Sequence, residues 1–450
     1  MFENKKVLIL GLARSGYSAA LTLKKLNCEI IVNDIRLESE LNQNHVIALK
    51  KMNIKCIFGS HPDNLIDKSF DYLIKNPGIR NDHKYVLMAN ELNIPVINEV
   101  ELAYNLLPAG VKIVSITGSN GKTTTTTLTY NLLKKADLPV YLAGNIGYPI
   151  CSILDKVKSG DIIVTEISCQ QLANIDKFKP NIALLTNLSP AHIDFFGNYD
   201  KYKEIKIKLF KNQTKEDLAI LNLDDLDSLK YEKDIKSQKK YFSINEKTDS
   251  YLKDNKFYYQ NEFIMKRDLM FLKGNHNVSN ALGAIIIAKQ FHVSNEVIED
   301  VLKNFKGVEH RLEYVDTVNN ITFYNDTEAT NIKCTQIALS SFQNPIILFL
   351  GGLERGQNFD DLKDYLNNVK IIIAIGECRE RVVDFANKNN IECYSFEWLK
   401  DGFKKCVQVA KPNDVVLLSP ASASWDQYKE CEERGTEFKN LVLEYKNECN

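Results

Sequence analysis

Short apolar runs alternate with helix-patterned segments along most of the chain. Apolar and β-branched residues occupy 113–116, and a segment follows with Leu128, Leu132 and Leu133 on one face. Such runs are typical of buried parallel strands, and the longer spacing is typical of amphipathic helices. Similar runs occur at residues 7–10, 30–32, 72–74, 162–164, 182–185, 346–350, 371–375 and 415–418. The alternation predicts an α/β protein with parallel sheets.

The order of these elements predicts three domains. Residues 1–97 begin with strand, glycine turn and helix, which is typical of a Rossmann-like domain. Residues 98–307 form the expected central domain, in which the alternating runs 256–260 and 262–265 predict a hairpin. Residues 308–450 return to the strand–helix rhythm and predict a third, Rossmann-like domain.

Composition excludes several classes of function. The chain has 57 basic and 58 acidic residues, so no basic field favours nucleic acid or an anionic membrane. Its ten cysteines include no C-x-x-C pair, which is typical of a reduced cytosolic protein rather than of a disulfide framework. The N-terminal apolar run is too short for a signal peptide, and no stretch approaches the ~20 apolar residues of a membrane span. We therefore expect a cytoplasmic protein, without membrane insertion, that acts as a monomer.

A glycine-rich loop directly after the strand at 113–116 predicts a phosphate site. Its sequence, GSNGKT at 118–123, leads into a helix-patterned segment. Glycines let backbone N–H groups approach phosphate oxygens, and a helix N-terminus adds partial positive charge. Lys122 can reach the β- and γ-phosphates, and the Thr123 hydroxyl can ligate Mg²⁺. The loop is shorter than the usual G-x-x-x-x-G-K-[ST], but the strand before it and the helix after it favour an ATP site over an ordinary turn.

Two further polar residues follow neighbouring predicted strands. Glu166 comes just after the run 162–164, and His192 lies in the loop after 182–185. In open α/β sheets, ligands bind at the carboxyl ends of the strands, so both residues could face the phosphate loop. A carboxylate at this place is the expected second partner of Mg²⁺. For His192, a ligand and an ordinary loop histidine remain equally open.

The first domain also has features of a dinucleotide site. A glycine turn at 11–16 follows the first strand, and Asp34 ends the second. However, Ala13 stands where a middle glycine would let the backbone meet a pyrophosphate. The pattern therefore favours another nucleotide over NAD, and a nicotinamide dehydrogenase would leave the ATP loop unexplained.

Motifs along essentially the whole chain resemble those of the Mur ligase family. They are TGSNGKT at 117–123, AGNIG at 143–147, YKEIKIKLFKNQ at 202–213, GNHNVSNAL at 274–282, EHRLE at 309–313, NDTEATN at 325–331, GGLERG at 351–356 and LLSPASASWDQY at 417–428, followed by Arg434 and Gly435. The first several are shared with the related folylpolyglutamate synthases. The last two, with the Rossmann-like first domain, resemble the family member that adds D-glutamate.

This resemblance implies an ATP-dependent ligase of peptidoglycan precursor synthesis. ATP would phosphorylate the carboxylate of UDP-N-acetylmuramoyl-L-alanine, and the amine of D-glutamate would attack the acyl phosphate. The resemblance implies that ATP is bound by Gly118, Ser119, Asn120, Gly121, Lys122, Thr123, Thr124, Asn277, Asn280, Arg311 and Asp326. It assigns the UDP-sugar to Arg14, Ser15, Asp34, Arg36, Asn76, Gly78, Asn145, Ser168 and Gln171. It assigns D-glutamate to Thr330, Arg355 and Ser424.

The resemblance further implies two Mg²⁺ ions and a modified lysine. Metal binding is implied for Thr123, Glu166, His192 and Lys206, and the catalytic set is Lys122, Glu166, His192 and Lys206. A lysine ammonium has no lone pair for a metal, so Lys206 is expected as a carbamate. Without the family context, Lys206 would be interpreted as an exposed helix lysine.

The chain departs from the family pattern at Glu328, where the family usually has lysine. Inverting one charge about 5 Å from an anion, at an effective dielectric of about 20, changes the interaction by roughly 6 kcal/mol. Either Glu328 points away and another cation such as Arg355 compensates, or turnover is slow. A weak nucleotide-sugar-binding paralogue and another ligase of the superfamily therefore remain alternatives. Cys169 and Gln170 also replace a usual serine and aromatic residue, a change that looks tolerable.

Overall fold

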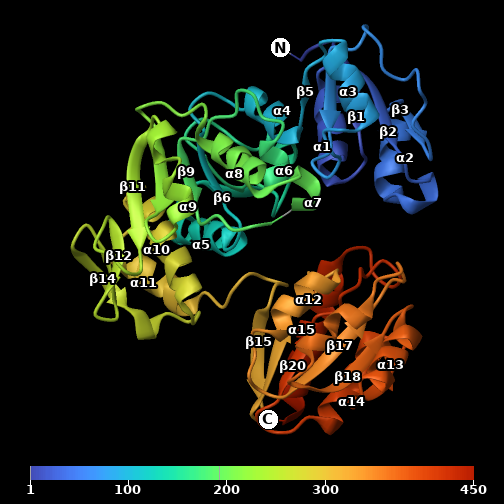
Figure 1. The fold of residues 1–450 in the computed structure, drawn as a ribbon, viewed down its shortest axis with the longest axis vertical. Coiled ribbons are helices and arrows are strands. Elements are labelled where there is room, and N and C mark those ends of the chain that lie inside the picture. Colours follow the sequence, from blue (N-terminus) through green and yellow to red (C-terminus); the bar gives the residue numbers. More distant parts are fainter. Residues whose placement is uncertain (1, 192, 450) are drawn as a thin grey trace. The chain divides into compact units, whose positions relative to one another are not determined.

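The computed structural model describes residues 2–191 and 193–449, and it has the α/β architecture that the sequence predicts (Figure 1). The described residues form three separate sheets, and most of their strands pair in parallel. The chain divides into two compact units, Met1–Phe305 and Lys306–Asn450. The break lies two residues before the linker expected at 307/308, whereas the 97/98 boundary falls inside the first unit and stays a prediction. No described helix is both long and apolar enough to cross a membrane.

The first sheet has the strand order β3-β2-β1-β4-β5, and every pairing is parallel. Its strands are β1 (Lys6–Leu10), β2 (Glu29–Asp34), β3 (Lys55–Phe58), β4 (Tyr72–Lys75) and β5 (Val96–Ile97). Its helices are α1 (Arg14–Lys25), α2 (Gln43–Lys51), α3 (Lys84–Glu91) and α4 (Glu99–Leu106). Because the strand order reverses between β1 and β4, their carboxyl ends leave a crevice where ligands bind in such folds.

The second sheet has nine strands in the order β14-β13-β12-β11-β10-β9-β6-β8-β7. They are β6 (Lys112–Thr117), β7 (Val140–Gly144), β8 (Ile162–Glu166), β9 (Ile182–Leu185), β10 (Leu218–Asn222), β11 (Gln238–Ser243), β12 (Ser250–Lys253), β13 (Lys256–Tyr259) and β14 (Glu262–Lys266). The antiparallel pair β13–β14 is the predicted hairpin.

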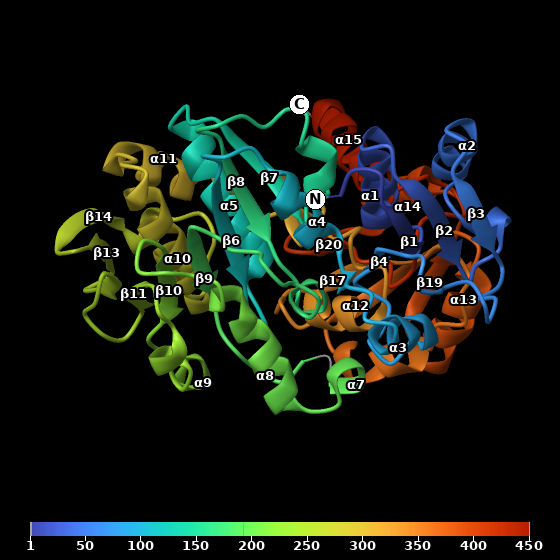
Figure 2. The same cartoon turned by 90° about the horizontal axis from the view of Figure 1, so that it is seen from above.

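The helices of this part are α5 (Lys122–Lys135), α6 (Cys169–Leu172), α7 (Ile193–Phe196), α8 (Tyr199–Ile207), α9 (Leu226–Leu229), α10 (Asn275–Gln290) and α11 (Asn295–Asn304). Helix α5 packs against β8, α10 and α11 (Figure 2). As the sequence predicts, Leu128, Leu132 and Leu133 form its fully buried face.

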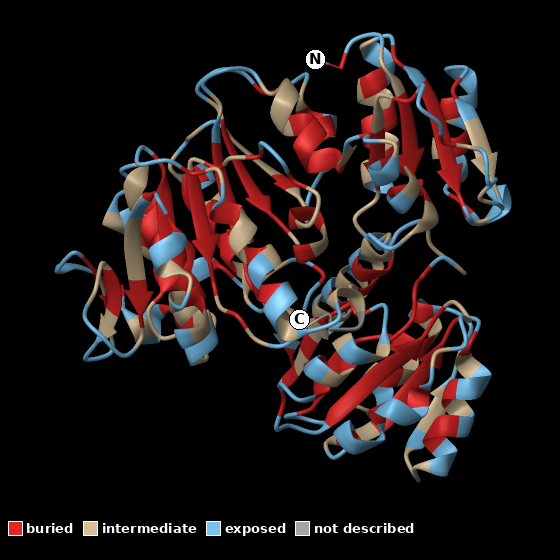
Figure 3. Cartoon of the chain, turned by 45° about the horizontal axis from the view of Figure 1, so that its top comes forward, coloured by how far each residue is buried: buried red, intermediate tan, exposed pale blue. Residues whose placement is uncertain are grey.

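The unit Lys306–Asn450 has one sheet, in the order β15-β16-β20-β17-β18-β19. Its strands are β15 (Glu313–Val318), β16 (Ile321–Asn325), β17 (Ile346–Gly351), β18 (Val369–Ile375), β19 (Glu392–Ser395) and β20 (Val415–Leu418). Its helices are α12 (Ile332–Leu339), α13 (Arg379–Lys388), α14 (Leu399–Val409) and α15 (Cys431–Cys449). Every residue of β17 and β20 is buried, and the central strands of the sheets are buried in Figure 3.

Candidate active site

The phosphate loop joins β6 to α5 and needs its two glycines. Gly121 has φ +78°, and a Cβ there would lie 2.2 Å from Oδ1 of Asn280. Gly118 has φ +151°, and a Cβ there would lie 1.9 Å from Oγ1 of Thr186. Side chains cannot be accommodated at either place, so the backbone of the loop can approach a ligand closely.

Hydrogen bonds from the end of β9 hold the loop in shape. The N–H of Ser119 donates to the carbonyl of Asn187 at 2.9 Å, and the N–H of Asn120 donates to the side-chain oxygen of Asn187 at 3.0 Å. Thr186 donates through its hydroxyl to the carbonyl of Asn120 at 2.6 Å. The sequence analysis did not identify Thr186 and Asn187, although they directly follow a predicted strand. The loop is thus preformed.

Lys122 and Thr123 are the first residues of α5. The Nζ of Lys122 donates to the carbonyl of Ser119 at 2.9 Å, which keeps the ammonium at the loop. The side chain of Thr123 is buried, and Thr124 is half-buried. A cation and a hydroxyl at a helix N-terminus are suited to phosphate and Mg²⁺.

Glu166 is the last residue of β8, and its two carboxylate oxygens differ in their hydrogen bonding. Its Oε1 accepts a hydrogen bond of 2.7 Å from the side chain of Asn145. Its Oε2 is buried and has no hydrogen-bond partner among the described residues. Buried carboxylate oxygens are rarely left without a partner, and Mg²⁺ prefers such ligands, so the donor set fits the ion that the sequence predicts.

Lys206 lies on α8 and reaches the phosphate loop. It is 1% exposed, and its Nζ donates to Oγ1 of Thr117 at 3.0 Å and to the carbonyl of Gly118 at 2.7 Å. Burial, with the nearby charge of Lys122, lowers the pKa of Lys206 to about 7. A neutral amine is the form that can react with CO₂, so the environment fits a carbamate. His192, the other predicted metal ligand, lies outside the described residues.

The remaining residues assigned to ATP come from two units. The Asn280 side chain on α10 lies beside Gly121, and the Asn277 side chain, one turn earlier, donates to the carbonyl of Lys273 at 2.9 Å. Arg311 and Asp326 belong to the second unit. Asp326 accepts hydrogen bonds from the backbone of Leu312 and the hydroxyl of Ser419, and burial raises its pKa to about 6.

A cavity of about 510 Å³ opens at the carboxyl ends of β1, β2 and β4. It is lined by Gly11, Ala13, Asp34, Ile35, Arg36, His61, Asn76, Ile79 and His83. Asp34 pairs with Arg36 at 2.8 Å and accepts the N–H of Leu12 at 2.7 Å, which fixes the glycine turn. Burial alone would raise the pKa of Asp34, but these two partners lower it below its usual value.

The other residues assigned to the UDP-sugar surround this cavity or the Glu166 strand. The side chain of Asn76 donates to the Ser15 hydroxyl at 3.1 Å and accepts the N–H of Gly78 at 3.0 Å. Arg14 is exposed and is the first residue of α1. The helix therefore begins inside the glycine turn predicted at 11–16. Ser168 caps α6 and exchanges hydrogen bonds with Gln171.

Two histidines in the cavity wall were not identified from the sequence. The rings of His61 and His83 meet edge to face, with 4.8 Å between centroids. Nδ1 of His61 lies 2.5 Å from the side-chain oxygen of Asn33. Burial lowers the pKa of both histidines. They come from separate loops and carry no local motif, so only the fold brings them together.

In the second unit, the residues assigned to D-glutamate lie on three loops. The guanidinium of Arg355 stacks on the ring of Trp425, 4.6 Å from its centroid. The neighbouring Ser424 is buried, and its hydroxyl has no hydrogen-bond partner among the described residues. Thr330 is exposed at the end of the third loop. An unsatisfied hydroxyl and an accessible guanidinium are suited to a carboxylate ligand.

The buried Arg434 ties two of these loops together. Its Nε donates to the Thr327 hydroxyl at 3.0 Å, and its Nη2 donates to the carbonyl of Ser422 at 3.0 Å. A Cβ on Gly352, at the start of the loop that carries Arg355, would lie 3.0 Å from its Nη1. The loops are therefore held at fixed separations.

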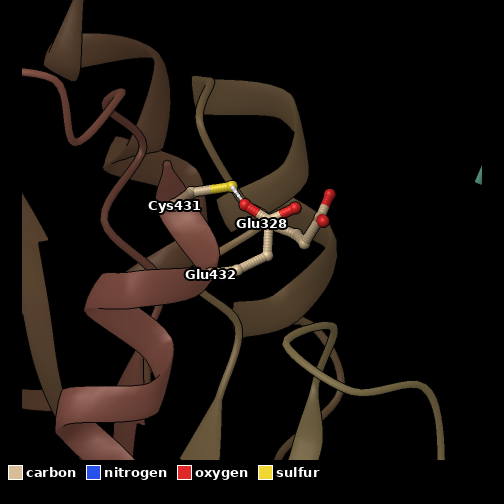
Figure 4. Close-up of side chains that lie close together, drawn as sticks. All are labelled: Glu328, Cys431 and Glu432. Atoms are coloured by element: carbon tan, nitrogen blue, oxygen red, sulfur yellow. Dashed lines mark hydrogen bonds between the residues drawn. The ribbon is translucent and has the colours of Figure 1, made fainter. Parts of the chain in front are cut away.

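Glu328, the unusual residue of the family pattern, faces the start of α15. Its carboxylate, the thiol of Cys431 and the carboxylate of Glu432 have ligand atoms within 4.8 Å of one another (Figure 4). None of the ion pairs found among the described residues includes Glu328, and Arg355 stacks on Trp425 instead. Burial, with the charge of Glu328, raises the pKa of the Cys431 thiol to about 12, so this group of side chains is not a thiolate site at neutral pH.

Comparison with known proteins decides the family. Residues 116–288 match the Mur ligase middle domain, and residues 310–422 match the Mur ligase glutamate ligase domain. The chain is 43% identical over 444 residues to UDP-N-acetylmuramoylalanine–D-glutamate ligase of Bacillus cereus (strain G9842), covering 98% of each protein. It is 44% identical over 445 residues to the protein of that name from Bacillus mycoides (strain KBAB4), again covering 98% of each. The chain belongs to the Mur ligase family.

Solved structures of other family members share the fold of this Mur ligase. UDP-N-acetylmuramate-alanine ligase MurC of Thermotoga maritima has a TM-score of 0.56 at 19% identity, covering 98% of this chain and all of the other. MurF of Acinetobacter baumannii has a TM-score of 0.56 at 17% identity, covering 98% and 93%. MurF of T. maritima, solved with ADP, has a TM-score of 0.53 at 20% identity, covering 92% and 95%.

The family membership confirms the resemblance in the motifs. Mur ligases are ATP-dependent, need Mg²⁺ and form peptide bonds, as the motifs imply. The nicotinamide dehydrogenase alternative is therefore dropped.

Proposed function

We propose that this enzyme adds D-glutamate to UDP-N-acetylmuramoyl-L-alanine in peptidoglycan precursor synthesis, through an acyl phosphate. The observation that carries the proposal is the identity of 43% over 98% of the chain to ligases of that name. The shared length supports the same three-domain organisation, 1–97 for the UDP-sugar, 98–307 for ATP and 308–450 for D-glutamate. We expect a cytoplasmic monomer that acts on small molecules.

The phosphate loop and Lys122 would bind and neutralise the phosphates of ATP. Thr123 and the spare oxygen of Glu166 would hold a first Mg²⁺. The ion would supply positive charge that neutralises the phosphates during phosphoryl transfer. Asn277 and Asn280 would contact adenine, whereas Arg311 and Asp326 would contact a phosphate and the ribose.

Lys206 would be carbamylated and would hold a second Mg²⁺ with His192. An ammonium cannot ligate a metal, whereas a carbamate presents two oxygens. The buried position of Lys206 at Thr117 and Gly118 supports this role. Its amine donates to the loop, and carbamylation would leave one N–H donor and add two acceptor oxygens.

The UDP end of the sugar substrate would occupy the cavity between β1, β2 and β4, with Asp34, Arg36 and Asn76 in its wall. Arg14, Ser15 and Gly78 lie at the adjoining turns, and Asn145, Ser168 and Gln171 would contact the muramoyl-alanine end. Arg355, Ser424 and Thr330 would hold the carboxylates of D-glutamate. Placing nucleophile and acyl phosphate in line supplies much of the rate enhancement in such reactions.

A weak nucleotide-sugar-binding paralogue is the second candidate, because Glu328 lies beside Glu432 and has no ion-pair partner among the described residues, in a loop where the family has lysine. The inverted charge would weaken the electrostatic interaction with the anionic substrates by the full roughly 6 kcal/mol only if Glu328 faced them. Its side chain instead lies against α15, which favours an active enzyme.

Phosphate release from ATP, measured with UDP-N-acetylmuramoyl-L-alanine and D-glutamate, L-glutamate or no amino acid, tests the proposal. Release that depends on D-glutamate supports it. Release with a different amino acid would assign the chain to another ligase of the superfamily. If the UDP-sugar binds but no phosphate is released, the paralogue is favoured, and Glu328→Lys is the next variant to assay.

A further inference from the structure

A buried lysine directly precedes the turn that forms part of the wall of the nucleotide cavity. Lys75 is the last residue of β4, pairs with Leu10 of β1, and is 1% exposed. Its Nζ donates to the carbonyl of Ile79 at 2.5 Å, and none of the ion pairs found among the described residues involves it. Burying an ammonium without a carboxylate partner is costly, so such a residue is retained only where something compensates for the cost.

The hydrogen bond of Lys75 sets the position of the cavity wall. It closes the turn at residues 76–79 from the inside, and the turn also has a backbone bond of 3.0 Å from Ile79 to Asn76. Asn76 and Ile79 both line the cavity. A Cβ on Gly11 would lie 2.8 Å from Cβ of Asn76 and 3.0 Å from Cδ1 of Ile79. The turn thus packs directly against the glycine turn across the cavity floor.

The other charged groups around the cavity compensate one another. Asp34 pairs with Arg36 at 2.8 Å. Lys84, which donates to the carbonyl of His61, pairs with Asp63 at 3.0 Å.

The histidines of the wall add no charge at neutral pH. Burial and neighbouring positive charges lower the pKa of His61 and His83, so both are neutral near pH 7. Among the described residues at this end of the sheet, Lys75 is the buried cation that has no ion-pair partner, whereas Arg14, which also has none, is exposed.

We infer that Lys75 is a positioning residue of the nucleotide site, which fixes the turn at 76–79 and supplies the positive charge that favours a diphosphate in the cavity. Because its ammonium is covered, it acts through the turn and through its field rather than by touching the ligand. This inference rests on the proposed UDP-sugar site, and it assigns the diphosphate, rather than the uracil ring, as the part that Lys75 stabilises.

The test compares binding of UDP and of uridine to the full-length chain by calorimetry. Lys75→Met removes the charge but keeps an unbranched side chain that can stay buried, and Lys75→Arg keeps the charge. Lys6→Met is the matched control, since Lys6 lies on the adjacent β1 and is only partly buried. Lys75→Met should weaken UDP binding about tenfold or more at low salt, with uridine binding almost unchanged. Lys75→Arg should recover part of the loss, and Lys6→Met should bind like the wild type.

A pH series separates charge from shape. Burial lowers the pKa of Lys75 to about 8, so the ammonium is charged at pH 7 and mostly neutral at pH 9. The wild type should bind UDP more weakly at pH 9 than at pH 7, and Lys75→Met should lose this dependence. In turnover, Lys75→Met should raise KM for the UDP-sugar while changing kcat little.

Three results would overturn the inference. The variant Lys75→Met could bind UDP as tightly as the wild type does. Alternatively, its affinities for UDP and for uridine could fall by the same factor, which would mean that Lys75 only maintains the shape of the turn. The wild type could also bind UDP no better than uridine. The phosphate-release assay decides the proposed ligase activity independently, so failure of the inference is distinguishable from failure of that proposal.

Discussion

At the scale of single residues, Lys122 is the side chain whose removal should separate ATP chemistry from folding. We expect Lys122→Met to lower D-glutamate-dependent phosphate release by about 10²–10³-fold, because one preorganised charge at the transferred phosphate is lost. The matched control is Lys134→Met, on the exposed face of the same helix, which should retain full activity. Thermal unfolding should be similar in both variants. Equal activity of the two variants would contradict the role of Lys122.

Asp326 should give ATP binding a pH dependence. Burial raises the pKa of its carboxyl to about 6, although Ser419 and Leu312 stabilise the charged form. Below about pH 6 the carboxyl is protonated and accepts ribose hydrogen bonds less well, so KM for ATP should rise as pH falls from 7 to 5. Asp326→Asn should have a high KM that varies little over this range. A KM for ATP that stays constant between pH 7 and pH 5 in the wild type would show that Asp326 does not contribute to ATP binding.

At the scale of elements, the start of α5 can be tested with two glycine variants. Gly121 and Gly160 have φ of +78° and +93°, so alanine strains the backbone at both, by about 1 kcal/mol of unfolding free energy. Only at Gly121 would the added Cβ meet another side chain, Asn280, whereas nothing lies within 4 Å of it at Gly160. We expect Gly121→Ala to raise KM for ATP at least tenfold and Gly160→Ala to leave it unchanged. Similar KM values for ATP in the two variants would show that the phosphate loop can accommodate a side chain at position 121.

Burial explains which elements the sequence predicts. The strands β9, β17 and β20 are buried along their whole length, and their apolar runs are evident in the sequence. The strands β15 and β19 lie at sheet edges and are mostly half-buried, so their residues do not form such runs. The pattern therefore predicts most buried strands, but it missed the buried β10, and it predicted the hairpin β13–β14 at a sheet edge from its alternation.

The same reasoning applies to the candidate sites. The phosphate loop is contiguous, so its chemistry can be predicted from a few residues. The cavity wall combines His61 and His83 from separate loops, which no local pattern connects. Lys206 sits on a strongly polar helix and would be expected in solvent, yet it is 1% exposed. Only the resemblance to a known family identified it from sequence.

At the scale of the whole molecule, the division at residues 305/306 suggests that each unit can fold alone. The second unit has its own buried clusters on both faces of its sheet, and the first unit has one cluster that includes residues of both of its sheets and another around its first sheet. We expect a fragment of residues 1–305 to unfold cooperatively and to bind UDP like the full chain. It should release no phosphate in response to D-glutamate, because Asp326 and Arg355 are missing.

Mixing the fragments 1–305 and 306–450 tests what the linker contributes. A short tether holds two parts at an effective concentration in the millimolar range, so at about 1 µM of each fragment their encounter is roughly a thousandfold less favoured. We expect the mixture to show about 1% or less of the full-chain rate, rising with fragment concentration. Full activity at micromolar concentrations would mean that the units bind each other tightly without the linker. Activity that stays absent at high concentration would mean that one fragment does not fold, which its unfolding transition would show directly.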